Sequence, residues 1–155
     1  MEYIRAAKEG DQEAEGCIFC TLPAKGDDET ALILKRGQHG FVVLNRFPYN
    51  PGALMVAPFA HTGPDFERLA PHVANELQGL VRESVAALRE EMQPHGFNVG
   101  MNIGRIAGAG FPDHLHWHVV PRWGGDTNFM PVVGQTRVLP ELLVETYEHL
   151  APRFA

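Results

Sequence analysis

Three histidines alternate with apolar residues in the segment 114–120, which reads His-Leu-His-Trp-His-Val-Val. Successive side chains of a β-strand point to opposite faces, so the histidines share one face and the apolar residues line the other. Ring nitrogens crowded in this way need a metal, a phosphate or backbone groups as partners. The alternative is a surface patch or a chance metal site, which the apolar opposite face and the strand-ending Pro121 disfavour. The three residues are His114, His116 and His118.

This pattern resembles the signature of the histidine triad family of nucleotide hydrolases and transferases. The resemblance extends backwards through residues 96–104 and forwards through residues 121–131, Pro-Arg-Trp-Gly-Gly-Asp-Thr-Asn-Phe-Met-Pro. The forward stretch is similar to the bacterial diadenosine tetraphosphate phosphorylase branch of the family. The resemblance implies an α+β fold, in which one long helix packs on a mostly antiparallel five-stranded sheet and a helix follows at the C-terminus. It also implies a homodimer or a tetramer.

The patterns along the chain agree with five strands and two helices. Short apolar runs between turn residues predict strands at 30–35, 39–45, 53–57 and 97–103, before the triad strand. Apolar residues at threes and fours predict a helix over 65–92, with its regular part starting near Ala70 because Pro71 interrupts the first turns. Pro140 and helical spacing predict a C-terminal helix over 139–150.

A length of 155 residues is that of one ordinary domain. We expect a single domain over 1–155, made of an N-terminal segment with a cysteine pair (1–29), a core of sheet and helix (30–121) and a C-terminal extension (122–155). The net charge is −6, and nucleic-acid binding depends largely on clustered Lys and Arg, so we expect a small-molecule ligand and no nucleic acid. No apolar run is long enough for a membrane helix, and the acidic start Met1–Glu15 is unlike a signal peptide. We therefore expect a cytoplasmic protein that does not bind membranes.

The two cysteines of the chain, Cys17 and Cys20, form a Cys-x-x-Cys pair. This spacing suits two thiolates on one tetrahedral zinc ion better than a structural disulfide. A reduced pair without metal and a thioredoxin-like redox motif are the alternatives. The resemblance implies that His61 and His114 complete a zinc site, and that the zinc is structural.

A neutral imidazole is a good nucleophile near pH 7, and phosphorus is a suitable target for it. The resemblance implies that His116 attacks the α-phosphorus of a bound nucleotide and forms a nucleotidyl-histidine intermediate, which passes to water or to phosphate. His118 would hydrogen-bond the phosphate or the leaving oxygen. A backbone carbonyl that accepts from the other ring nitrogen of His116 would fix its tautomer.

Several residues are expected to hold the substrate. By resemblance Asn45 contacts the ribose, although an Asx-turn that only shapes the loop is an equal alternative. Asn102 and the glycine-rich backbone of Gly108, Ala109 and Gly110 are implied to hold the polyphosphate, and a flexible connector is the alternative. Local positive charge is expected from Arg105, Arg122 and protonated His118. Ala53 departs from the histidine that most family members carry, so no proton-handling role is assigned there.

Three functions fit these observations. The first is a diadenosine tetraphosphate phosphorylase, which the stretch from Trp123 to Pro131 favours. The second uses water as acceptor and would be a dinucleoside polyphosphate hydrolase or a nucleoside phosphoramidase. The third is a nucleotide-binding interaction protein without turnover, which predicts a degenerate middle histidine, whereas His116 is intact.

Overall fold

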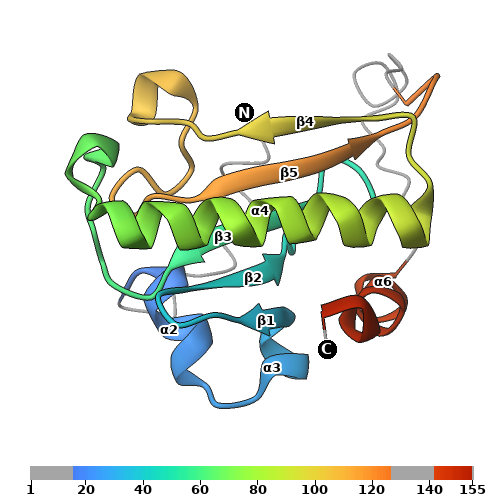
Figure 1. Cartoon of the computed structure of the whole chain (residues 1–155), viewed down its shortest axis with the longest axis horizontal. Coiled ribbons are helices and arrows are strands. Elements are labelled where there is room, and N and C mark those ends of the chain that lie inside the picture. Colours follow the sequence, from blue (N-terminus) through green and yellow to red (C-terminus); the bar gives the residue numbers. More distant parts are fainter. Residues whose placement is uncertain (1–15, 127–141, 155) are drawn as a thin grey trace.

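Strands of the described chain form one sheet in the order β1-β2-β3-β5-β4, and all neighbouring strands are antiparallel (Figure 1). The computed structural model describes residues 16–126 and 142–154. The strands are β1 (Ile33–Arg36), β2 (Gly40–Leu44), β3 (Leu54–Pro58), β4 (Gly96–Gly100) and β5 (Trp117–Arg122).

Helix α4 (Pro71–Met92) covers one face of this sheet (Figure 1). It begins with Pro71 at its first turn, where proline has the right φ and a missing N–H costs no hydrogen bond. Its apolar face packs on β2, β3 and β5, and α6 (Leu143–Leu150) with the 3-10 turn η3 (Ala151–Phe154) closes the same core. The core includes Leu44, Leu54, Leu77, Leu88, Trp117, Val119, Leu150 and Phe154.

The opposite face of the sheet holds the short helices α2 (Ile18–Ala24) and α3 (Asp28–Ala31). Strand β2 is buried along its whole length because its side chains alternate between the two faces: Val42 belongs to the core under α4, and Phe41 belongs to a second cluster with Phe19. This second cluster supports the surface on which the functional pocket lies.

Two 3-10 turns lie in the loops of the chain, one before α4 and one before the triad. These are η1 (Phe66–Arg68), just before α4, and η2 (Arg105–Ala107), in the glycine-rich loop before the triad.

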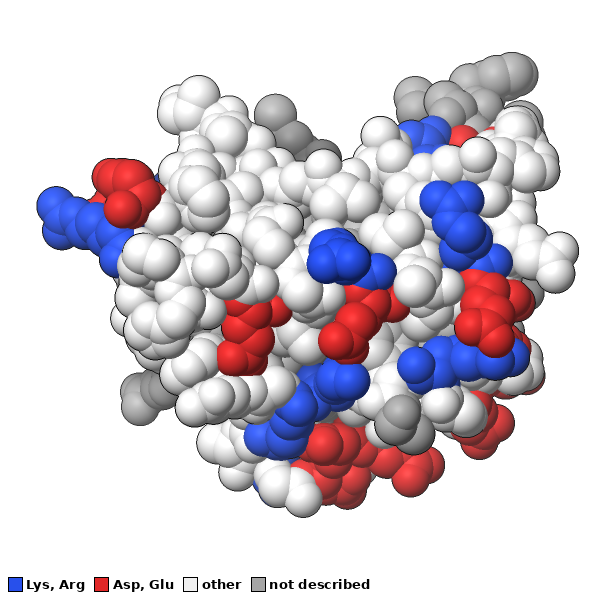
Figure 2. Space-filling view, viewed as in Figure 1, with Lys and Arg blue, Asp and Glu red and all other residues white. Residues whose placement is uncertain are grey.

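The described helices include none that is long and apolar enough to cross a membrane. On the face shown in Figure 2, acidic and basic side chains alternate instead of forming a continuous basic area, and some form ion pairs such as Lys35 with Glu83 at 2.9 Å.

The predicted sheet, long helix and C-terminal helix are confirmed, but several boundaries differ, and three of the differences concern the strands most. Residues 30–31 belong to α3 and not to a strand, because Asp27 caps that helix by accepting from the Thr30 amide at 3.1 Å. The fourth strand ends at Gly100 and not at Ile103. Regular strand β5 begins only at Trp117, so His114 and His116 precede it. The predictions on Met1–Glu15, on residues 127–131 and on the helix start at 139–141 lie outside the described residues.

Candidate active site

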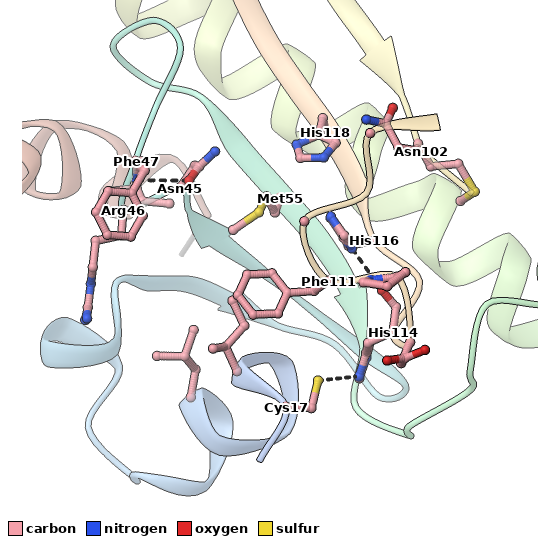
Figure 3. Close-up of a pocket in the computed structure, with 18 of the residues that line it drawn as sticks. Cys17, Asn45, Arg46, Phe47, Met55, Asn102, Phe111, His114, His116 and His118 are labelled. Atoms are coloured by element: carbon pink, nitrogen blue, oxygen red, sulfur yellow. Dashed lines mark hydrogen bonds between the residues drawn. The ribbon is translucent and has the colours of Figure 1, made fainter. Parts of the chain in front are cut away.

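A pocket of about 1120 Å³ lies on the side of the sheet away from α4. Its lining comes from α2, the end of β2, β4, the glycine-rich loop and the triad segment (Figure 3). The lining includes the apolar residues Ile18, Leu22, Leu32, Leu44 and Met55, and it also includes all three triad histidines. The pocket therefore offers an apolar surface next to a cluster of imidazoles.

The middle histidine of the triad is held by the backbone in one tautomer. The Nδ1 of His116 lies 2.9 Å from the carbonyl oxygen of His114, so Nδ1 carries the proton and donates it to that oxygen (Figure 3). Nε2 then keeps its lone pair. The ring of His118 lies edge-on to that of His116, with centroids 4.9 Å apart. The expected tautomer-fixing carbonyl is thus present, and it belongs to His114.

Burial keeps these imidazoles neutral. It lowers the pKa of His116 to about 4, although the hydrogen bond to His114 opposes this shift, and the charge on His118 adds to it. Burial also lowers the pKa of His118. A neutral imidazole is the nucleophilic form. The expectation that protonated His118 offsets phosphate charge is therefore disfavoured, because desolvation penalises that cation.

The four predicted metal ligands meet at one edge of the pocket. The ligand atoms of Cys17, Cys20, His61 and His114 all lie within 4.8 Å of one another. Nδ1 of His114 is 3.3 Å from Sγ of Cys17 and 3.7 Å from Sγ of Cys20, and Nδ1 of His61 is 3.5 Å from Sγ of Cys20. A sulfur and a nitrogen on one tetrahedral zinc ion are about 3.6 Å apart, given the usual bond lengths. The cluster therefore fits a tetrahedral metal ion.

The surroundings of His114 support the same conclusion. Its Nε2 donates to the carbonyl oxygen of Pro58 at 2.9 Å, which leaves the Nδ1 lone pair facing the cysteines. Burial lowers the pKa of His114, so the ring is neutral, as a ligand must be. Burial raises the pKa of the Cys17 thiol, so its thiolate needs a nearby positive charge, which a metal ion would supply. Both cysteines are free of disulfides.

The expected substrate-binding residues lie around the pocket with one exception. Asn45 borders it and forms the Asx-turn, because its Oδ1 accepts from the Phe47 amide at 3.0 Å (Figure 3). Asn102, Gly108 and Gly110 also line the pocket, whereas Ala109 is buried and is not among the lining residues. Gly108 has a φ of +91°, and a Cβ there would lie 3.3 Å from the Asn102 amide nitrogen, so this position requires glycine.

Of the two arginines expected to offset phosphate charge, only one borders the pocket. Arg105 lines the pocket, but Arg122 does not. The Arg122 guanidinium donates to both carboxylate oxygens of Asp126 at 2.6 and 2.8 Å and to Asn98 at 2.5 Å. Asp126 also accepts from the Asn50 amide at 2.8 Å. The expectation that Arg122 compensates phosphate charge is therefore not supported, because its charge is already paired with Asp126.

Two features of the site were missed by sequence reasoning. The apolar part of the lining comes from α2, from Ala31 and Leu32 at the end of α3, and from strands β2 and β3. The sequence pattern predicts the strands without showing which residues border a cavity. Phe19 packs on the ring of His116, although 97 residues separate the two in the sequence. The only signal for Phe19 was its place between the two cysteines.

Comparison with known proteins identifies the family of the chain. A family model described as HIT domain matches residues 27–125. A Mycobacterium tuberculosis H37Rv protein named AP-4-A phosphorylase is 42% identical over 137 residues, which are 88% of this chain and 69% of that protein. The Bacillus subtilis 168 protein named Protein hit is 31% identical over 116 residues, covering 75% of this chain and 77% of the relative.

Solved structures share the fold. A Zn-bound histidine triad family protein from Mycobacterium smegmatis superposes with a TM-score of 0.72 at 22% identity, over 90% of this chain and 93% of the other. A HIT family protein from Bacillus anthracis gives a TM-score of 0.63 at 29% identity, over 73% of this chain and 77% of the other.

Proposed function

The chain belongs to the HIT domain family, and on that premise we propose that it cleaves dinucleoside polyphosphates as a diadenosine tetraphosphate phosphorylase does, by nucleotidyl transfer through His116. It is an enzyme of the nucleotidyltransferase or hydrolase type. The observation that carries the proposal is the hydrogen bond from Nδ1 of His116 to the His114 carbonyl. Because this bond holds the proton on Nδ1, Nε2 is the free nucleophile beside the pocket.

In the first step, Nε2 of His116 attacks the α-phosphorus in line. A nitrogen–phosphorus bond forms while the anhydride phosphorus–oxygen bond breaks, and the second nucleotide leaves with the oxygen and its electron pair. An oxygen of phosphate or water then attacks the same phosphorus, and the nitrogen–phosphorus bond breaks to return neutral His116. His118, whose ring is 4.9 Å away, hydrogen-bonds the phosphate or the leaving oxygen.

The pocket supplies complementary surfaces for one nucleotide. The apolar lining residues Leu22, Leu44 and Met55 suit the faces of a base. Asn45 borders the same pocket and is proposed to contact the ribose. Asn102 and the backbone of Gly108 and Gly110 are proposed to hold the polyphosphate, with positive charge from Arg105, which also lines the pocket.

Zinc is the proposed occupant of the cluster formed by Cys17, Cys20, His61 and His114. Two sulfur and two imidazole ligands are typical of structural zinc, and the similar M. smegmatis protein is Zn-bound. When bound, the ion would supply charge neutralisation for the thiolates and a cross-link between distant segments. His114 would then hold the metal with its side chain and His116 with its carbonyl oxygen.

Two alternatives keep the same pocket. A dinucleoside polyphosphate hydrolase or nucleoside phosphoramidase differs only in the acceptor, and the name of the M. tuberculosis relative favours phosphate. A nucleotide-binding protein without turnover is disfavoured because the nucleophile and its carbonyl partner are both intact.

The test is incubation with diadenosine tetraphosphate, with and without inorganic phosphate, and chromatography of the products. ADP with ATP, formed only when phosphate is present, is the expected result. AMP with ATP regardless of phosphate would identify a hydrolase.

The same assay tests the nucleophile. His116→Ala is expected to abolish turnover while nucleotide binding, measured by calorimetry, persists. His149→Ala on α6 is the control and should keep normal activity, since this exposed residue is not among those that line the pocket. Normal turnover by His116→Ala would refute the mechanism.

A further inference from the structure

Phe19 connects the cysteine pair with the catalytic histidine. Its side chain is 0% exposed, and it lies in the sequence between Cys17 and Cys20. Its ring stacks on the imidazole of His116, with centroids 4.6 Å apart and planes inclined by 28°. The same ring lies 5.3 Å from the ring of His114.

The hydrogen bond to the His114 carbonyl restrains the position of the His116 ring but not its tilt. It fixes the position of Nδ1, but a ring held at one atom is still free to tilt about the Nδ1···O axis. A flat aromatic surface against one face of the imidazole removes that freedom, because tilting would break a close stacked contact. The two restraints together determine where the Nε2 lone pair points, and in-line attack on phosphorus depends on that direction.

We propose that Phe19 is a positioning residue that orients the His116 imidazole for attack. The inference rests on the proposed function, in which His116 is the nucleophile. Phe19 touches the nucleophile and not the pocket: it is fully buried and is not among the residues that line the cavity.

The position of Phe19 is set by two anchors. Cys17 caps the start of α2 and Cys20 lies in its first turn, and both sulfurs belong to the four-ligand cluster. The ring also meets Phe111 edge-on, with centroids 6.0 Å apart. The cluster, through the backbone of α2, and the contact with Phe111 therefore both restrain the ring that stacks on His116.

The experiment compares two substitutions of the same kind in the same cluster. Phe19→Leu removes the ring that stacks on His116. Phe41→Leu is the matched control, because Phe41 is also 0% exposed and belongs to the same apolar cluster, but its ring stacks on Phe59. Each variant is examined for kcat and KM with diadenosine tetraphosphate, for melting temperature, and for the NMR shifts of the His116 ring protons, assigned with His116→Ala.

Both variants are expected to lose melting temperature to a similar extent. Phe19→Leu alone should lower kcat by about tenfold or more while KM changes less than about twofold, because a misdirected nucleophile binds substrate but reacts slowly. Phe19→Leu alone should also move the His116 ring protons downfield, since protons above the face of a phenyl ring resonate upfield. If Phe19→Leu does not fold, Phe19→Met, whose flexible side chain fills the same space, takes its place.

Equal losses of kcat in the two variants would overturn the inference, and so would unchanged His116 shifts in Phe19→Leu. These results are distinguishable from a failure of the proposed function. If His116→Ala kept its turnover, the nucleophile assignment would fall, yet the ring-proton shifts would still report whether Phe19 orients His116.

Discussion

Gly40 lies at the start of β2, where the strand passes under α4. A Cβ at this position would clash with the Leu77 side chain and would lie 2.8 Å from the carbonyl oxygen of Ala57. The second contact is with backbone of the paired strand β3, which cannot move aside without disturbing the sheet. We expect Gly40→Ala to lower the free energy of unfolding by about 1–3 kcal/mol, as overpacked cores do. Urea denaturation followed by circular dichroism measures this.

Gly79 provides the control for this prediction. It lies in the interior of α4, and a Cβ there would meet nothing within 4 Å. Gly79→Ala should therefore stabilise the protein by about 0.5–1 kcal/mol, because alanine loses less backbone entropy in a helix. If both substitutions had the same sign, the steric explanation for Gly40 would be wrong.

Single residues show where prediction from sequence succeeds. The alternation of the triad predicted that its imidazoles gather on one surface, and the spacing of Cys17 and Cys20 predicted that their thiols lie close enough for one metal ion. Both patterns are informative because few other roles require these residue types at these spacings. The stacking of Phe19 on His116 and the pairing of Arg122 with Asp126 were not predictable. The first contact joins segments that are far apart in the sequence, and the second depends on the irregular geometry of the turn after β5.

Helix α2 depends on tertiary anchors for its stability. It has seven residues, no side-chain cap at its start, and Pro23 inside it, and such short helices are not stable alone. Its anchors are buried Phe19 and the two cysteines of the proposed metal site. Cys20→Ala is expected to release the metal and to destabilise the protein. The loss should approach about 4 kcal/mol when free metal exceeds its dissociation constant a thousandfold.

The measurement pairs metal content by atomic emission with urea denaturation. His72→Ala, which removes an exposed histidine at the start of α4, should keep both the metal and the stability of the parent protein. An unchanged metal content or an unchanged unfolding midpoint in Cys20→Ala would reject a structural metal at this cluster.

The elements show why boundaries are harder to predict than types. The apolar period of α4 is long enough to specify a helix, and Pro71 marks its start. The segment before β1 is short and apolar in part, and only the hydrogen bonds from Thr30 to Asp27 decide that it is helical. The triad departs from regular strand geometry before Trp117, where His114 engages Pro58 and His116 engages His114. Alternation in sequence carries no information about such local contacts.

The two edges of the sheet differ in how they are covered. Edge strand β1 is covered by the C-terminal segment, where Tyr147 donates to the Ile33 carbonyl at 3.2 Å and Lys35 donates to the Phe154 carbonyl at 3.5 Å. The outer edge of β4 meets no strand of the described chain (Figure 1). Val99 on this edge is 48% exposed, beside a shallow apolar groove of about 540 Å³ that also includes Val81 and Val85 of α4. Uncovered apolar edges favour pairing with another chain.

The family resemblance implies a homodimer, with twice the 17.2 kDa mass of one chain, and we propose that a second copy of the chain pairs at this edge. Val99→Lys should give single chains by light scattering, because an unpaired charge would have to be buried in the interface. Val144→Lys is the control, since Val144 is 58% exposed but lies on α6. A single-chain mass for the parent protein at micromolar concentration, or equal dissociation of both variants, would show that β4 is not the interface.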